Sequence, residues 1–268
     1  MTAPESARDA YDRYAAVYDE CNAQNDYEMW LGEVLLPVLE EHGLQKGWAL
    51  DVGCGTGRAF DPLLARGWEV VGCDVSSGML AEAARKFGSR IRLLHVDARS
   101  LPPISPAAGV PDTEAFHLIL LLNDVVNYVL EDGDLEKVFA GVRSNLSRDG
   151  GLVAFDANTL GLFRDHFALD DEEGMGDRGW DWQGLSAPGT PGSVFEARLS
   201  GRGVETHIHR QRHWTSEQVT EALAACGLER LALLGQREEG GRVLLSESLD
   251  EERDEKAIYV AAHAGHSG

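Results

Sequence analysis

The sequence is poor in cysteine, in basic residues and in long apolar runs. Its four cysteines, Cys21, Cys54, Cys73 and Cys226, form no CxxC pair. This spacing disfavours a cysteine zinc site and a dense disulfide framework, and a reducing cytoplasm is the expected setting. Apolar runs such as Leu118–Leu122 are far shorter than the ~20 residues of a membrane-spanning helix. The first residues are partly acidic and lack an apolar stretch, so no signal peptide is expected.

Acidic residues outnumber basic ones almost two to one. Asp and Glu total 45, Lys and Arg total 24, and the formal net charge is −21. Such a charge keeps a protein soluble and repels phosphate backbones and anionic lipids. We therefore expect neither a nucleic acid nor a membrane as partner. A neutral or cationic small molecule is favoured, and the chain is expected to act as a monomer or homodimer.

The apolar pattern of the first half of the chain predicts alternating strands and helices. Strands are expected at 48–52, 69–73, 91–96, 116–122 and 151–155, and helices at 59–66, 78–87 and 135–146. This alternation at βαβ spacing is typical of a parallel α/β sheet. A helix at 215–226 and strands near 229–235 and 256–262 are expected to complete the sheet.

The segments around this core follow different patterns. Two amphipathic helices are expected at 5–20 and 27–41, whereas 157–192 shows no sustained period. Residues 193–200 and 204–214 alternate as a hairpin around Gly201-Arg202-Gly203. The chain is therefore expected to divide into an N-terminal helical segment (1–46), a cofactor-binding core (47–156), an antiparallel insertion (157–214) and the remainder of the core sheet (215–268).

The strongest motif is ALDVGCGTG at 49–57. An apolar strand delivers Asp51 and is followed by Gly53, Gly55 and Gly57. Glycines at this place allow a tight turn and a close approach of the backbone to a ligand. Taken alone, the cluster is equally compatible with a strand–helix turn that binds nothing.

The next two predicted strands also end on acids, Asp74 and Asp97. In open parallel sheets, ligands bind at the carboxyl ends of the strands. Asp74 is placed to accept hydrogen bonds from both hydroxyls of a ribose. Asp97 is placed to accept from an adenine amino group, while Ala98 offers a backbone N–H. Three acidic strand ends in register predict an adenosine ligand.

The glycine motif also restricts which adenosine ligand fits. The dinucleotide fingerprint is G-x-G-x-x-G, but Arg58 stands where its third glycine belongs, and no Walker lysine follows. Asp51 would repel a pyrophosphate and suits an ammonium or a sulfonium. An NAD-linked dehydrogenase is therefore disfavoured, and S-adenosylmethionine fits the pattern.

Five segments of the chain resemble, in order, the successive motifs of class I S-adenosylmethionine-dependent methyltransferases. They read ALDVGCGTG, EVVGCDVSSGML, LLHVDARSLP, HLILLLNDVVNYV and LSRDGGLVAFD, roughly within residues 45–156. The resemblance implies an α/β fold with a Rossmann-like, mostly parallel seven-stranded sheet and helices on both faces. It also implies S-adenosylmethionine as cofactor and S-adenosylhomocysteine as product.

Two flanking segments extend the resemblance. The opening YDRYAAVYDE is similar to the N-terminal lid of small-molecule members, where tyrosines close over the cofactor. The insertion ending in HIHRQRHW is similar to the antiparallel β cap of bacterial small-molecule N- and O-methyltransferases, including sugar N-methyltransferases. The lid is expected over 1–46 and the cap, inserted after the fifth strand, over 157–214.

The resemblance assigns roles to single residues. The expected cofactor-binding residues are Tyr14, Asp51, Gly53, Gly55, Asp74, Val75, Met79, Asp97, Ala98 and Asn123. Asp51, Gly53 and Gly55 would line the methionine moiety, and Asn123 would lie beside it. Asp74 would bind the ribose, and Asp97 with Ala98 would hold the adenine. The expected substrate-binding residues are Tyr18, Asn127, Trp182 and His213.

Histidines are the candidates for a general base. A hydroxyl acceptor usually needs one, and histidine has its ordinary pKa near neutrality. His207, His209 and His213 alternate onto one strand face, and His207 and His209 are the expected catalytic residues. This face is either solvated, substrate-lining or, as a weaker alternative, metal-binding. No carboxylate or thiolate partner is identifiable for a metal, so no metal is expected.

The function expected from these observations is methyl transfer to a nitrogen or oxygen of a small-molecule metabolite. The first alternative is a non-catalytic S-adenosylmethionine-binding protein, which would need no substrate cavity. The second is a methyltransferase acting on RNA or protein. Work on RNA would need a basic surface, and the sequence shows none.

Overall fold

The computed structural model describes residues 6–23, 26–106, 115–168, 179–187, 189–201, 203–240 and 242–265. Within these residues, an eight-stranded sheet has the order β10-β9-β11-β5-β4-β1-β2-β3. Its strands are β1 (Trp48–Val52), β2 (Glu69–Asp74), β3 (Arg92–His95), β4 (Leu118–Leu121), β5 (Leu152–Asn158), β9 (Leu228–Glu239), β10 (Arg242–Ser246) and β11 (Lys256–His263). Strands β1 to β5 pair in parallel, and β11 runs antiparallel to both β5 and β9.

The expected mostly parallel Rossmann-like sheet is confirmed, and the structure adds one strand to it. All seven expected strands are present in this sheet, and β10 pairs antiparallel with β9 at its edge. The extra strand escaped prediction because it is short and only half buried, so its side chains carry no clear alternation.

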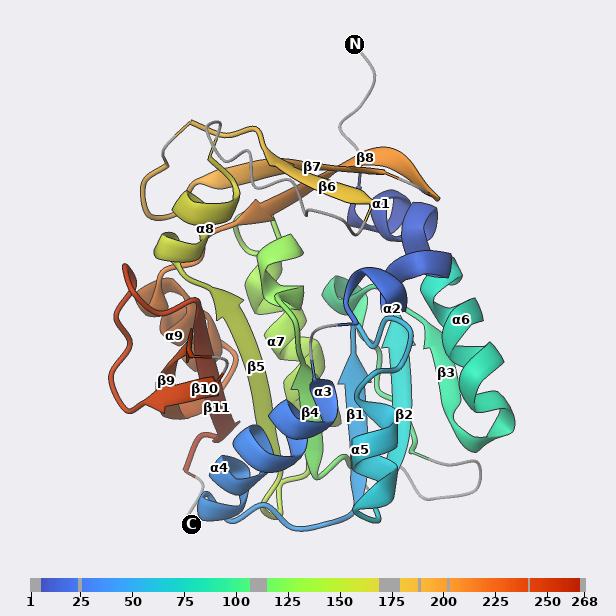
Figure 1. Cartoon of the computed structure of the whole chain (residues 1–268). Helices are drawn as coiled ribbons and strands as arrows, with labels where there is room; N and C mark the ends of the chain where they lie inside the picture. The colour runs from blue at the N-terminus through green and yellow to red at the C-terminus, as the bar shows by residue number, and fades with distance from the viewer. Residues whose placement is uncertain are drawn as a thin grey trace.

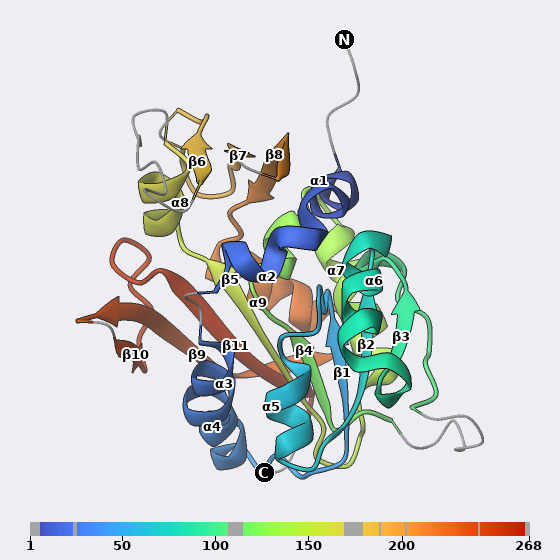
Figure 2. The ribbon, with the colours of Figure 1, turned by 45° about the vertical axis from the view of Figure 1, so that its right-hand side comes forward.

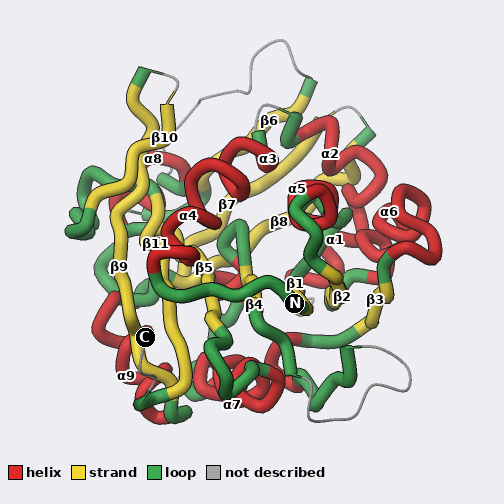
Figure 3. The backbone as a smooth tube through the Cα atoms, turned by 90° about the horizontal axis from the view of Figure 1, so that it is seen from below, coloured by secondary structure: helices red, strands yellow, loops and turns green. Residues whose placement is uncertain are grey.

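Helices cover both faces of the sheet. They are α1 (Ala7–Tyr14), α2 (Tyr18–Cys21), α3 (Tyr27–Met29), α4 (Leu36–Glu41), α5 (Phe60–Ala65), α6 (Ser77–Phe87), α7 (Asp134–Asn145), α8 (Leu160–His166) and α9 (Ser216–Ala225). Side chains of α7 and α9 pack on one face, and those of α4, α5 and α6 pack on the other. Figure 3 shows the strands between these two groups of helices.

Helix starts follow the expected capping chemistry. Ser76 accepts a hydrogen bond from the backbone of Met79 at the start of α6. Thr215 and Gln218 form a reciprocal capping box at the start of α9. Both helices therefore begin where local sequence places them, and α6 begins directly after the end of β2.

The two N-terminal helices expected from the sequence are subdivided. The first consists of α1, a 3₁₀ turn (Ala15–Val17) and α2, and the second of α3, a π-helical segment (Trp30–Leu35) and α4. Pro37 lies at the start of α4 and has no N–H to donate, which interrupts the regular hydrogen-bond ladder there. Residue periodicity does not register such local changes of helix type.

A second, three-stranded antiparallel sheet stands over the carboxyl ends of the parallel strands (Figure 1). It contains β6 (Trp180–Gly184), β7 (Val194–Gly201) and β8 (Val204–Arg212). The expected hairpin of β7 and β8 is confirmed. Helix α1 lies against β8, at the same end of the main sheet (Figure 2).

The segment between β5 and β7 contains structure that periodicity did not predict. Helix α8 begins two residues after β5, and β6 pairs with β7. Strand β6 has no clean alternation of buried and exposed side chains, because it is defined by long-range pairing.

Candidate active site

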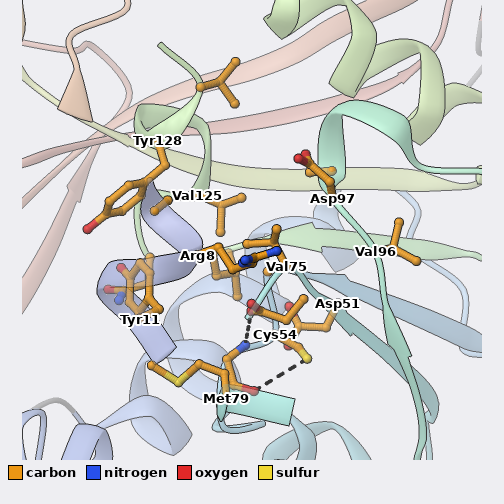
Figure 4. A pocket seen from close by; sticks show the side chains of 18 of the residues that line it. Arg8, Tyr11, Asp51, Cys54, Val75, Met79, Val96, Asp97, Val125 and Tyr128 are labelled. Carbon is orange, nitrogen blue, oxygen red and sulfur yellow. Dashed lines mark hydrogen bonds between the residues drawn. The ribbon is translucent and has the colours of Figure 1, made fainter. Parts of the chain in front are cut away.

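A cavity of about 450 Å³ opens at the carboxyl ends of the parallel strands. Its wall combines strand ends with side chains of the N-terminal helices and of the segment after β4 (Figure 4). The expected cofactor residues that line it are Asp51, Gly53, Gly55, Asp74, Val75, Met79, Asp97, Ala98 and Asn123. The structure therefore brings the expected cofactor residues to one cavity, apart from Tyr14.

The glycine turn after β1 is held by backbone hydrogen bonds. The N–H groups of Gly53 and Cys54 donate to the carbonyl of Cys73, at 2.8 and 3.0 Å. Gly53 and Gly55 have φ angles of +74° and +52°, which favour glycine. A Cβ on Gly53 would stand 2.5 Å from Val125, whereas one on Gly55 would meet no heavy atom within 4 Å. Open space at Gly55 leaves room for a ligand against the backbone.

Asp74 connects this turn to the end of β2. Its carboxylate accepts hydrogen bonds from the backbone N–H of Gly55 at 2.8 Å and of Ser76 at 2.7 Å. Burial raises the pKa of Asp74 above its ordinary value, while these backbone donors lower it. The carboxylate thus fixes the turn and borders the cavity at the same time.

The Asp51 carboxyl group lies near the end of β1, just before the glycine turn. Its side chain is 3% exposed and faces the cavity. Burial, and secondarily the nearby charge of Asp74, raises the pKa of Asp51 to about 7. A cation in the cavity would favour the ionised form. The Asp51 carboxylate therefore fits a ligand that carries a sulfonium and an ammonium, such as S-adenosylmethionine.

Asp97 follows β3 at another side of the cavity. Arg99 holds its carboxylate through two side-chain nitrogens, at 2.6 and 3.0 Å, and through its backbone N–H at 2.9 Å. The hydrogen bonds from Arg99 lower the pKa of Asp97. Asp97 is therefore a fixed, ionised acceptor at the cavity wall.

The end of β4 carries unusual backbone geometry. Asn123 and Asp124 have φ angles of 65° and 59°, a left-handed conformation that is uncommon outside glycine. Asp156 stabilises it by accepting the backbone N–H groups of both residues, and Lys256 neutralises Asp156 at 2.6 Å. The Asn123 amide is thereby turned to donate to the Tyr18 hydroxyl, at 3.1 Å. Strain of this kind gathers at functional sites.

Tyrosines of the N-terminal helices close one side of the cavity. Tyr11 and Tyr18 line it, whereas Tyr14 lies behind them and stacks on His207 with ring centroids 5.2 Å apart. Asp12 ties α1 to the start of α6 by accepting from the Ser76 hydroxyl at 2.6 Å and from the Gly78 N–H at 2.7 Å.

The histidine face of β8 is turned inward. His207, His209 and His213 are each 1% exposed, so the solvated alternative for this face is wrong. None of the three lines the cavity. Rings of Tyr11, Tyr14 and Tyr128 pack against His207 and His209. His213 packs instead against the ring of Phe163. Alternation along the sequence predicts that these histidines share one face of the strand, but it does not predict which side chains cover that face.

The remaining expected substrate residues also stand apart from the cavity wall. Asn127 bridges β5 and β8 by accepting from the Asn158 N–H and donating to the Arg212 carbonyl, both at 2.9 Å. Trp182 donates to the His166 carbonyl at 2.8 Å. His213 accepts from the Gly192 N–H at 3.2 Å and contacts the Glu251 carboxylate at 3.1 Å. The bond of Asn127 to Arg212 and the contact of His213 with Glu251 join the 157–214 segment to the rest of the fold, whereas the bond of Trp182 lies within that segment.

Sequence reasoning missed several residues of the cavity wall, among them Arg58, Tyr27 and Tyr128. The Arg58 guanidinium lies 5.2 Å from the centroid of the Tyr27 ring, and both residues line the cavity. Arg58 directly follows the glycine motif, which was a usable signal. Tyr128 also lines the cavity, but nothing in the local sequence distinguishes it from a core tyrosine.

The residues that the structure describes contain no group of three or more His, Cys, Asp and Glu side chains placed to hold a metal ion. Among the helices of this described part, none combines the length and apolar content needed to cross a membrane.

Comparisons of sequence connect the chain to known proteins. The family of methyltransferase domains matches residues 49–150. The uncharacterized methyltransferase GK2543 of Geobacillus kaustophilus is 31% identical over 166 residues, covering 62% of this chain and 68% of that protein. The methyltransferase YqeM of Bacillus subtilis is 27% identical over 232 residues, covering 82% of this chain and 86% of that protein.

Solved structures share the fold. An S-adenosylmethionine-dependent methyltransferase from Clostridium acetobutylicum superposes with a TM-score of 0.70 at 22% identity, covering 95% of this chain and 99% of that one. The sugar N-methyltransferase KedS8 from a Streptoalloteichus species gives 0.65 at 19% identity, covering 98% and 96%. With its cavity suited to a sulfonium ligand and its sequence similarity to methyltransferases, the chain belongs to the class I S-adenosylmethionine-dependent methyltransferases.

Proposed function

We propose that the protein transfers the methyl group of S-adenosylmethionine to a nitrogen or oxygen of a small-molecule metabolite. The observation that carries this proposal is the cavity itself. It is bounded by three acidic strand ends on one side and by tyrosines of the N-terminal helices and of the segment after β4 on the other. The net charge of −21 disfavours RNA, and the overall fold resembles that of the sugar N-methyltransferase KedS8.

The floor of the cavity would hold the cofactor. Asp51 would balance its positive charge, and Gly53 and Gly55 would allow its methionine part to approach the backbone. Asp74 would accept hydrogen bonds from the ribose, in addition to those it accepts from Gly55 and Ser76. Asp97, held by Arg99, would accept from the adenine amino group.

The bound cofactor supplies a methyl group already activated on a sulfonium, so the protein's task is to orient the acceptor and exclude water. The N-terminal lid, proposed over 1–46, would close the cavity through Tyr11 and Tyr18. Asp12 would hold this lid on the start of α6. An amine acceptor must arrive uncharged, since its lone pair forms the new bond.

Labelling with a deuterated methyl group tests this proposal. The protein is incubated with the labelled cofactor and either D-glucosamine, ethanolamine or a fractionated extract of its source cell. A mass shift in a small molecule supports the proposal, and the Asp74→Ala variant should abolish most of it. Label confined to RNA or protein, or label in no fraction while S-adenosylhomocysteine still binds, would contradict it.

A further inference from the structure

A chain of hydrogen bonds runs from the cavity wall into the cap. The Tyr128 hydroxyl lies 2.7 Å from Nδ1 of His209. Nε2 of His209 lies 3.0 Å from Nε2 of His207. Nδ1 of His207 lies 2.7 Å from the backbone carbonyl of Glu205. Of these residues, only Tyr128 lines the cavity, where it stands on the same side as Tyr11 (Figure 4).

The direction of every hydrogen bond in this chain follows from its far end. A backbone carbonyl only accepts, so Nδ1 of His207 carries the proton there. Nε2 of an uncharged His207 then accepts from the Nε2–H of His209. The other nitrogen of an uncharged His209, Nδ1, is left as an acceptor and takes the Tyr128 O–H. The two histidines therefore hold opposite tautomers.

His207 and His209 are each 1% exposed, and burial disfavours the charged form of an imidazole. Burial, reinforced by His207, lowers the pKa of His209 to about 3. The rings packed around His209 come from α1, η5 (Val125–Tyr128), β6 and β8, and they belong to Tyr11, Tyr14, Tyr128, Trp182 and His207. Burial, and after it the charge of Asp124, raises the pKa of Tyr128, while side-chain hydrogen bonds with Tyr11 and Gln211 lower it by less. The tyrosine therefore stays protonated.

We propose that the chain commits the Tyr128 proton to His209, so that the Tyr128 oxygen acts as a hydrogen-bond acceptor for the N–H or O–H of the methyl acceptor. His209 and His207 are positioning residues that act through Tyr128 without contacting the substrate. The inference rests on the proposed function and names a specificity-determining contact for it. When the nitrogen or oxygen to be methylated donates its hydrogen to Tyr128, its lone pair points away from Tyr128. That lone pair is then available to attack the methyl group of the cofactor.

The structural half of the proposal is tested by ¹⁵N NMR of the histidine rings in the full-length protein without ligand. Substitution of single histidines by Gln assigns the signals. We expect His207 as the Nδ1–H tautomer and His209 as the Nε2–H tautomer, both uncharged from pH 5.5 to 8. The same tautomer in both rings, or titration of His209 in this range, would overturn the proposal whatever the enzyme methylates.

The functional half uses D-glucosamine, ethanolamine and any acceptor found by labelling. Tyr128→Phe should lower kcat/KM for the acceptor about tenfold, the usual scale for one lost hydrogen bond in a buried site, and leave the Kd of S-adenosylhomocysteine unchanged. His209→Leu should do the same. His209→Gln keeps one acceptor and one donor and should restore most of the loss.

The two halves separate the possible failures. Wild-type kinetics in Tyr128→Phe, or equal losses in His209→Leu and His209→Gln with folding intact, would overturn the proposal even where the tautomers are as expected. If no small molecule is methylated by the wild-type protein, the proposed function fails and this role of Tyr128 fails with it, while the NMR result still decides the tautomers.

Discussion

The floor and the cap side of the cavity are built in different ways. On the floor, each functional carboxylate lies at or just beyond the carboxyl end of a parallel strand, and Asp74 accepts hydrogen bonds from backbone amides of the adjacent turns. On the cap side, Tyr11, Tyr128 and His209 come from three segments that are far apart in the sequence. A floor made of strand ends is a local product of the βαβ pattern, whereas the cap side exists only after tertiary packing. Substitutions on the two sides should therefore fail in different ways.

The largest effect is expected at the glycine turn of the floor. Gly53→Ala should lower the free energy of unfolding by about 3 kcal/mol, because a left-handed residue costs ~1–2 kcal/mol and overpacking ~1–3 kcal/mol. The added Cβ would stand 2.5 Å from Val125. Gly43→Ala is the matched control, since φ is +85° there but nothing lies within 4 Å. Urea unfolding measures both, and equal losses would contradict the packing argument.

The next effect is expected on cofactor affinity. Asp74→Ala should raise the Kd of S-adenosylhomocysteine at least tenfold, or ~1.4 kcal/mol, because it removes the proposed ribose acceptor and releases Gly55. Glu69→Ala changes an exposed acid at the opposite end of β2 and should leave the Kd unchanged. Isothermal titration calorimetry gives both values. An unaltered Kd in Asp74→Ala would remove this residue from the binding site.

Asp51 should make binding of S-adenosylmethionine depend on pH. The folded-state pKa is about 7, so the carboxyl is mostly protonated at pH 6 and mostly ionised at pH 8. If the cationic ligand requires the ionised form, its affinity should be about tenfold weaker at pH 6 than at pH 8. Asp51→Asn should flatten this dependence, and an unchanged pH profile in the variant would refute the assignment.

In the absence of ligand, the raised pKa of Asp51 makes the protein less stable as the pH rises, whereas cofactor binding should become tighter. Burial raises the pKa of Asp51 above its unfolded value, so the folded state binds more protons between about pH 4 and pH 7. The contribution of this proton to stability is full below about pH 4 and is lost as the pH rises through 7. Comparison of wild type and Asp51→Asn by urea unfolding across this range measures it.

The smallest effect is expected at the contact of α1 with the floor. Asp12→Asn should loosen α1 and raise the Kd of S-adenosylhomocysteine about threefold, because a charged acceptor of two hydrogen bonds becomes neutral. Amide hydrogen exchange in α1 should rise. Asp9→Asn, an exposed acid of the same helix, serves as control. Faster exchange in both variants alike would show that helix propensity, and not the contact with α6, stabilises α1.

The sequence predicted the floor well because its signals are short-range. Asp51, Asp74 and Asp97 each lie at or just beyond the end of a strand whose apolar run is visible, and register in a parallel sheet brings neighbouring strand ends together. On the cap side, alternation placed His207 and His209 on one face, but it did not show that tyrosines of α1 and Tyr128 cover that face. It also missed α8 and β6, whose boundaries depend on long-range pairing.

The sequence by itself determined the alternation of strands and helices from β1 to β5, the tight turn at Gly53 and Gly55, and the acids that face the cavity. These depend on periodicity, on backbone freedom and on neighbours in the chain. Only the tertiary structure decided that the histidines of β8 are buried behind Tyr128, and that Asp51 has a pKa near neutrality. Burial and hydrogen-bond direction arise from segments that meet only in the folded chain, so no local pattern encodes them.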